Sequence, residues 1–145
     1  GRTYQLEIVN EQRKNLKFDG ERFYLHERAH HKAYEEFKRF YRTQGLEIVQ
    51  EYINKHAPAL QVEPGEVRVM ELGGRWGSCS EKTLNIHWKA IMAPRSILEY
   101  IVVHELVHLI HPTHSSEFWS TVDKILPDYW ERKKWLREKG ASLNI

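Results

Sequence analysis

Two histidines four residues apart, His104 and His108, flank a glutamate in the segment His104-Glu105-Leu106-Val107-His108. In a helix, positions i and i+4 lie on one face about 6 Å apart along the axis, so both imidazoles can reach one metal ion. Glu105 lies on the flank of that face, where a carboxylate can accept a proton from an attacking water instead of binding the metal. The HExxH spacing therefore predicts a zinc hydrolase whose general base is Glu105.

The sequence around the motif favours this interpretation over a chance match. Residues 97–110 read ILEYIVVHELVHLI, in which Glu99 and the three motif residues are the strongly polar groups. Burying three polar groups in an apolar helix costs several kcal/mol unless each has a partner, and a zinc ion would supply a partner for two of them. The alternative, a core helix with hydrogen-bonded histidines, is less favoured.

A third protein ligand is expected, because a catalytic zinc usually takes three side chains and leaves the fourth position for water. His114 is the preferred residue, since Pro112 disfavours helix at His111 and lets the chain turn back toward the metal. Glu117 is a weaker alternative, because it falls in the first turn of the next helix, where its charge favours the helix dipole.

His111 is not expected to bind the same ion. A straight helix places it about 10 Å from His104 along the axis, which is too far for one metal to bridge. It is interpreted as an imidazole at a helix C-terminus that could also line the site.

The six-residue offset from His108 to His114 matches the metzincin signature, but that signature has glycine at position 111 and a Met-turn downstream. Both methionines, Met70 and Met92, lie upstream, so the metzincin assignment fails.

Three further segments carry a family resemblance: GGRWGSCS (73–80), LNIHW (84–88) and APRSILEYIVVHELVHLIHPTHSSEFW (93–119). Together they resemble the YgjP-like metallopeptidase family, a zincin group related to the SprT/Spartan and WLM proteases, in which HExxH is followed by five residues and a third histidine. The resemblance covers at least residues 67–135. It implies that His104, His108 and His114 are zinc ligands, that Glu105 is the catalytic base and that the activity is proteolysis, and it does not identify a substrate.

Alternating apolar residues over 66–72 and 83–88 predict two antiparallel strands joined by a loop at 79–82. In zincin-like folds such a sheet packs on the metal helix, and its outer strand can accept an extended peptide. Asn85 and His87 share one face and are the better substrate-side candidates. For Arg75, Trp76 and Ser78 structural roles are favoured, with Trp76 in the core and Arg75 paired with a buried carboxylate.

The flanking sequence predicts the elements that hold this site. Residues 4–9 alternate as a strand, and 16–25 predict a hairpin turning at Asp19-Gly20. Residues 28–55 predict a long amphipathic helix with a weak point at Gly45, where it could kink, and with Pro58 beyond its end. Two short helices follow at 116–126 and 128–139, with Gly140 as C-cap. The expected fold is α+β and zincin-like: a small antiparallel sheet packed against the long N-terminal helix and the metal helix, in one domain over residues 1–145.

Composition limits the other functions. The chain has 22 Lys and Arg against 20 Asp and Glu, a net charge of +2, which is weak for a nucleic-acid protein. A nucleic-acid contact through the cations of the long helix is therefore the less favoured interpretation; these are His30, His31, Lys32, Lys38, Arg39 and Arg42.

A single cysteine, Cys79, fits a reducing compartment and is interpreted as a small buried thiol rather than a nucleophile. No apolar stretch reaches 18 residues and no signal peptide is recognised, so a cytoplasmic protein without a membrane span is expected.

The sequence thus predicts zinc-dependent hydrolysis of peptide bonds in a peptide or protein substrate. One alternative keeps the zinc without catalysis, as a zinc-stabilised module that binds a protein or nucleic-acid partner. Such a structural site would be closed by a fourth side-chain ligand and would gain nothing from an unpaired carboxylate at Glu105. A second alternative is hydrolysis of a non-peptide amide, which the motif does not distinguish from proteolysis.

Overall fold

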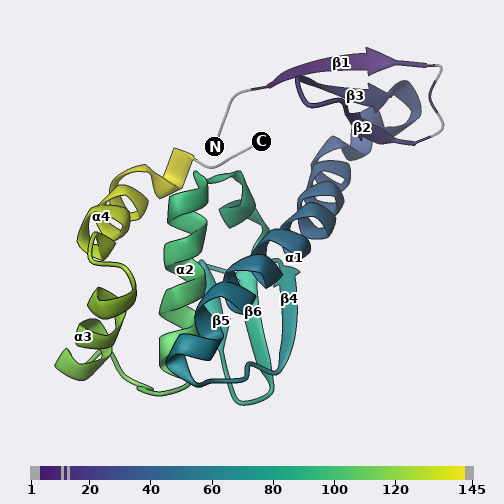
Figure 1. The fold of residues 1–145 in the computed structure, drawn as a ribbon. Helices are drawn as coiled ribbons and strands as arrows, with labels where there is room; N and C mark the ends of the chain where they lie inside the picture. The colour runs from purple at the N-terminus through teal and green to yellow at the C-terminus, as the bar shows by residue number, and fades with distance from the viewer. Residues whose placement is uncertain (1–3, 11, 13, 143–145) are drawn as a thin grey trace.

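The computed structural model describes residues 4–10, 12 and 14–142. Its elements follow one another as an N-terminal strand group, a long helix, a second strand group and three further helices (Figure 1). They are β1 (Gln5–Val9), β2 (Leu16–Phe18), β3 (Arg22–His26), α1 (Ala33–Leu60), β4 (Glu66–Met70), β5 (Gly77–Cys79), β6 (Thr83–His87), α2 (Arg95–His108), α3 (Ser116–Ile125) and α4 (Tyr129–Lys139), with short 3-10 turns η1 (Glu27–Lys32), η2 (Trp88–Met92) and η3 (Gly140–Ser142). The predicted α+β class is confirmed.

The first sheet, in the order β1-β3-β2, covers the N-terminal end of α1 (Figure 1). Strands β2 and β3 form the predicted hairpin, because the Asp19 carboxylate accepts hydrogen bonds from the backbone N–H groups of Glu21 and Arg22 at 2.9 and 2.8 Å. Gly20 follows with φ +100°, a conformation that favours glycine. The sheet and the start of α1 share a small apolar core, whose buried members are Leu16, Phe23, Leu25, Ala29 and Phe37.

Helix α1 is one continuous helix of 28 residues. It runs through Gly45 and includes Pro58, so the predicted weak point at Gly45 and the predicted end before Pro58 are wrong. A Cβ atom at Gly45 would collide with the side chain of Ile91 in η2, so the glycine serves close packing rather than a break in the helix. The helix ends at Leu60, and the left-handed conformation of the C-cap residue Gln61 (φ 57°) closes the last turn.

The second sheet has the order β4-β6-β5, and its central strand β6 pairs parallel with β4 and antiparallel with β5. The predicted antiparallel pairing of 66–72 with 83–88 is therefore wrong, and both sheets are mixed. The reason is that the segment Gly77-Ser78-Cys79 forms a strand of its own. It takes the hairpin position beside β6 through the turn at 80–82, which leaves β4 to join the opposite edge.

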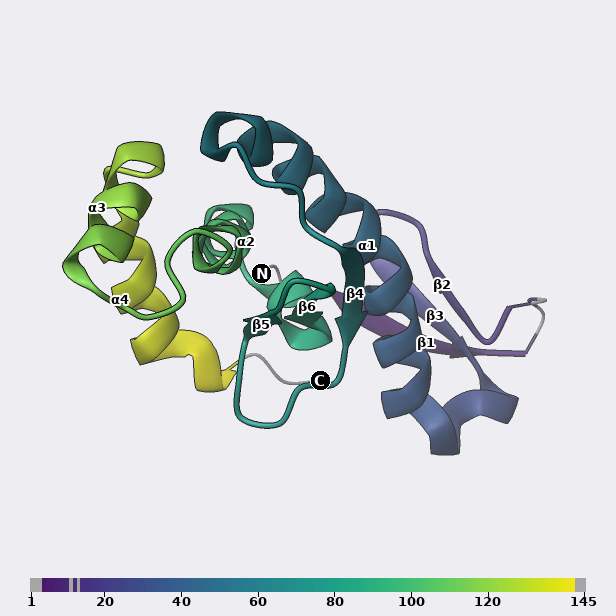
Figure 2. The same cartoon turned by 90° about the horizontal axis from the view of Figure 1, so that it is seen from below.

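Helix α2 lies at the centre of the molecule, with the second sheet and α1 on one side and α3 and α4 on the other (Figure 2). Its side chains Val102, Val103, Leu106 and Val107 are fully buried, because α2 is covered by packed elements on both sides. The main core therefore surrounds the helix that carries the HExxH motif. None of the described helices combines the length and apolar character that a membrane-spanning helix requires.

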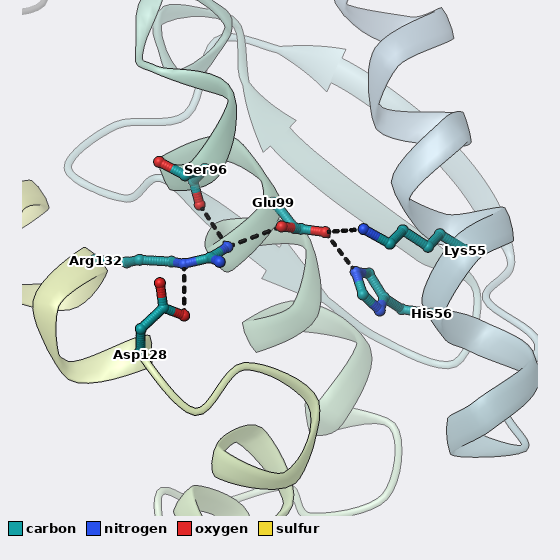
Figure 3. Close-up of polar contacts among 6 residues, drawn as sticks. All are labelled: Lys55, His56, Ser96, Glu99, Asp128 and Arg132. Atoms are coloured by element: carbon teal, nitrogen blue, oxygen red, sulfur yellow. Dashed lines mark hydrogen bonds and ion pairs between the residues drawn. The ribbon is translucent and has the colours of Figure 1, made fainter.

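A buried carboxylate on α2, Glu99, ties three helices together (Figure 3). From α1, His56 contacts one carboxylate oxygen at 2.7 Å and Lys55 donates to the same oxygen at 3.1 Å. From α4, Arg132 donates to the other oxygen at 2.8 Å and to the backbone carbonyl of Ser96 at 3.1 Å. The arginine that pairs with this buried carboxylate is thus Arg132 and not Arg75.

This network predicts a pH-dependent contribution to stability. Burial alone would raise the pKa of Glu99, but hydrogen bonds from Arg132, His56 and Lys55 outweigh it and lower the pKa from its ordinary 4.5 to about 2. The stabilisation is therefore complete above pH 4.5 and is lost as the pH falls toward 2. At pH 6 we expect the free energy of unfolding of the wild-type protein to be roughly 1–3 kcal/mol larger than that of Glu99→Gln. Below pH 4.5 this difference should shrink.

Urea denaturation of both proteins between pH 6 and pH 2.5 measures this difference. Glu131, an exposed residue on α4, provides the control substitution Glu131→Gln, for which no such trend is expected. A wild-type advantage that stays constant over the whole range would contradict the assignment.

Candidate metal centre

The second histidine of the motif, His108, is the last residue of α2. The chain then leaves the helix in a tight turn, in which the backbone N–H groups of Ile110 and His111 both reach the carbonyl of Val107 at 2.9 Å. Pro112 follows and removes the next backbone donor. The chain therefore turns back at the point where the sequence predicts it.

Helix α3 then begins at Ser116, two residues after His114. Its N-cap is Ser115, whose hydroxyl accepts a hydrogen bond from the backbone N–H of Phe118 at 3.2 Å. The turn and the cap together bring His114 beside the two motif histidines, although six residues of sequence separate it from His108.

The three imidazoles face one another. The Nε2 atoms of His108 and His114 are 3.1 Å apart, and one ligand nitrogen from each of the three rings, His104 included, lies within 4.8 Å of the others. In a tetrahedral zinc site with Zn–N distances of about 2.0–2.1 Å, ligand nitrogens are about 3.3 Å apart. The donor types and their spacing therefore fit a zinc ion, and among the described residues this group has three members.

The protonation states of the rings suit metal binding. The Nδ1 atom of His108 lies 3.2 Å from the backbone carbonyl of His111. A carbonyl only accepts hydrogen bonds, so Nδ1 is the donor, and in the corresponding neutral tautomer the lone pair on Nε2 faces the cluster. Burial, together with the neighbouring His104 and His108, lowers the pKa of His114, which favours the neutral ring that a metal requires.

The carboxylate of Glu105 is buried beside this cluster. The residue is 4% exposed, its Oε1 lies 3.7 Å from Nδ1 of His104, and its Oε2 has no hydrogen-bond partner. Strand β5 approaches so closely that a Cβ atom at Gly77 would lie 2.8 Å from Cγ of Glu105. A buried carboxylate that is not used in structural hydrogen bonding is free to exchange protons with a bound molecule.

The cluster opens into a cavity of about 680 Å³ between β5 and α2. Along β5 and the residues that flank it, Arg75, Trp76, Ser78 and Cys79 contribute to its wall. Burial and the neighbouring Glu105 carboxylate raise the pKa of the Cys79 thiol to about 11. Cys79 is therefore a protonated thiol near neutral pH and not an activated nucleophile, but it is half-buried and lines the cavity, so the predicted buried position is only partly correct.

The residues that line the cavity are not the ones that the sequence analysis favoured for contact with a substrate. Asn85 and His87 do not line the cavity: Asn85 donates to the Ser78 hydroxyl at 3.1 Å, and His87 is buried and accepts from the backbone of Lys89. Ser78 does line it, as does Arg75, which is exposed and forms no ion pair with another described residue. The missed element is β5, and its signal in the sequence is the run of small residues Gly77-Ser78-Cys79, which allows close approach to α2.

The two alternative ligands lie outside the histidine cluster. The Nε2 atom of His111 lies 3.3 Å from the Thr121 hydroxyl on α3, so this ring contacts α3 instead of the cluster. Glu117 is exposed in the first turn of α3, where backbone and serine hydrogen bonds lower its pKa. Both side chains therefore make contacts in α3 or at its start, and neither joins the histidine cluster.

Three of the six cations that suggested a nucleic-acid contact lie on α1 and have partners within the chain. The other three, His30, His31 and Lys32, lie in η1. Lys38 lies 3.5 Å from the Glu71 carboxylate and Arg39 lies 3.4 Å from Glu36. Arg42 donates to the backbone carbonyl of Val69 at 3.1 Å. These intramolecular contacts lend the nucleic-acid interpretation no support, and it stays a prediction.

Comparison with known proteins adds to this geometry. The model of the YgjP-like metallopeptidase domain matches residues 1–139. Among solved structures, the chain is similar to the crystal structure of the metallopeptidase zymogen of Pyrococcus abyssi abylysin, with 26% sequence identity and a TM-score of 0.55 over 62% of this chain and 93% of that one. A search of curated proteins gave no significant match. The match over nearly the whole chain shows that this protein belongs to the YgjP-like metallopeptidase family.

Proposed function

We propose that this protein is a zinc-dependent peptidase whose active site is the cavity between β5 and α2. One observation carries the proposal. Three imidazoles have nitrogens that face one another, and beside them lies the buried carboxylate of Glu105, whose Oε2 has no hydrogen-bond partner. A structural zinc site closed by four side chains would leave such a carboxylate without a purpose, so the geometry gives the non-catalytic binding module no support.

In this proposal His104, His108 and His114 hold the zinc ion. When bound, zinc would supply Lewis-acid chemistry, polarising the scissile carbonyl and lowering the pKa of water. The Glu105 carboxylate, which lines the cavity, removes a proton from the attacking water and later passes that proton to the leaving amine. The His108 ring keeps its orientation through the hydrogen bond to the His111 carbonyl. As second donor to the developing oxyanion our candidate is Tyr100, because it lines the cavity and its ring packs against His104.

The substrate is a peptide bound in extended form along β5. Among the described strands, β5 is at the edge of its sheet and pairs with β6 alone, and all three of its residues line the cavity. The open edge of such a strand offers backbone N–H and C=O groups to a further strand. A peptide paired there lies next to Glu105, because Gly77 is packed against that side chain.

Cleavage of an unbiased peptide library by the zinc-loaded protein tests the proposal. We expect cleavage that disappears after treatment with a chelator and returns on addition of zinc, since the histidines need the ion to form a site. A parallel assay with small non-peptide amides separates proteolysis from general amidase activity. A zinc-loaded protein that cleaves no peptide in the library would refute the proposal.

A further inference from the structure

The first turn of α3 forms the floor of the histidine cluster. Phe118 is fully buried, and its ring centre lies 5.1 Å from that of His104, 4.6 Å from that of His108 and 5.0 Å from that of His114. Within the described part of the chain, no other aromatic side chain contacts all three imidazoles. The apolar side chain at this position therefore borders every ring that is proposed to hold the metal.

The next residue, Trp119, forms a side wall. Its ring lies nearly parallel to that of His114, with an interplanar angle of 28° and centres 5.8 Å apart, and 5.9 Å from the ring of His104. Trp119 is itself held from α4, where Tyr129 stacks on it at 5.5 Å and the Lys133 ammonium lies 4.0 Å from its centre. His114 is exposed and lies in a loop, so this wall restricts a ring that has few other neighbours.

The third histidine and the floor are also fixed to one another through the backbone. Ser115 follows His114 directly, and its hydroxyl accepts the hydrogen bond from the backbone N–H of Phe118. One N-cap thus sets the position of the loop end that carries His114 and of the helical turn that carries Phe118 and Trp119.

We infer that Phe118 and Trp119 form an aromatic cradle that holds the three imidazoles in a metal-binding arrangement before the ion binds, and so sets the affinity for the metal. The physical reason is preorganisation: side chains whose rotamers are already fixed lose less conformational entropy on binding. Phe118 and Trp119 are positioning residues in this inference, since they act through the histidines. The inference rests on the proposed zinc site and not on the proposed peptide cleavage.

Zinc affinity, measured by competition with a chromophoric chelator, tests the inference. The variant Phe118→Leu keeps an apolar side chain and removes the ring. We expect its zinc affinity to fall by about 10- to 100-fold, the size usual for residues that orient metal ligands. In cobalt-substituted protein, we expect the visible absorption bands of the metal to shift, because the ring positions around the ion change.

The matched control is Val122→Ala, one turn further along α3 in the same core and equally buried. It shortens a buried side chain in the same core and leaves every aromatic ring of the cradle in place, so its zinc affinity should stay within about threefold of wild type and its cobalt spectrum should not change. Unfolding of each metal-free protein is followed in the same samples. If Phe118→Leu does not fold, Trp119→Leu replaces it, with the same expected direction.

Zinc affinity and a cobalt spectrum that remain unchanged in both Phe118→Leu and Trp119→Leu would overturn the inference. An equal loss of affinity in Val122→Ala would overturn it too, since the effect would then follow core stability. A wild-type protein that binds zinc tightly and cleaves no peptide would refute the proposed function alone, because every readout in this test is a property of metal binding.

Discussion

Replacing Glu105 with glutamine is expected to lower kcat for peptide cleavage by about 10²- to 10⁴-fold, the usual contribution of a positioned general base. Glutamine has nearly the shape of glutamate and fits the space beside Gly77, but it has no carboxylate to accept a proton from the attacking water. Zinc content should stay unchanged, because Glu105 is placed beside the cluster and not in it. Steady-state kinetics and metal analysis on the same preparation measure both effects.

The matched control for this variant is Glu117→Gln. Glu117 lies close by in sequence and is exposed on α3, away from the cavity wall. Its replacement should leave kcat within about twofold of wild type, as expected for a surface substitution. Full peptidase activity in zinc-loaded Glu105→Gln would show that the proton acceptor is another group.

The second large effect is expected from His114→Ala, which removes one of the three nitrogens that face one another in the cluster. Loss of a direct ligand should weaken zinc binding by more than the 10- to 100-fold that is typical of supporting residues, so we expect a loss of at least about 100-fold. Peptidase activity at a fixed low zinc concentration should disappear with it. Isothermal titration or chelator competition gives the affinity.

His111→Ala is the control that tests the choice between the two neighbouring histidines. The His111 side chain contacts Thr121 and takes no part in the cluster, while its backbone carbonyl, which holds His108, remains after substitution. We expect the zinc affinity of this variant to stay within about tenfold of wild type. A larger loss in His111→Ala than in His114→Ala would reverse the ligand assignment.

The parts of the fold that the sequence predicts well are those that local signals determine. Apolar spacing and flanking caps locate α2, α3 and α4 to within a few residues, and Asp19-Gly20 marks the hairpin between β2 and β3. The return of the chain to the metal site is also local, because it follows from Pro112 and from the Ser115 cap. For this reason the histidine cluster could be proposed before its geometry was known.

The features that the sequence does not reveal depend on residues distant in the chain. The parallel pairing of β4 with β6 depends on β5, a three-residue strand of small residues without an alternating pattern. Glu99 has its partners on α1 and α4, 43 and 33 residues away. Gly45 is predicted to weaken the helix because its packing partner, Ile91, is 46 residues away in the chain. The confinement of residues 1–145 to one domain, and zinc as the native metal, stay predictions.

The cap at Ser115 has a consequence for how the protein responds to metal supply. The residue that caps α3, Ser115, directly follows His114, so under the proposed metal site we expect metal binding and formation of that turn to be linked equilibria. Such coupling is reciprocal: if the folded turn increases the affinity for the metal, the bound metal stabilises the turn against local unfolding by the same free energy. Under the proposed metal site, we therefore expect removal of the metal to make the first turn of α3 easier to unfold locally.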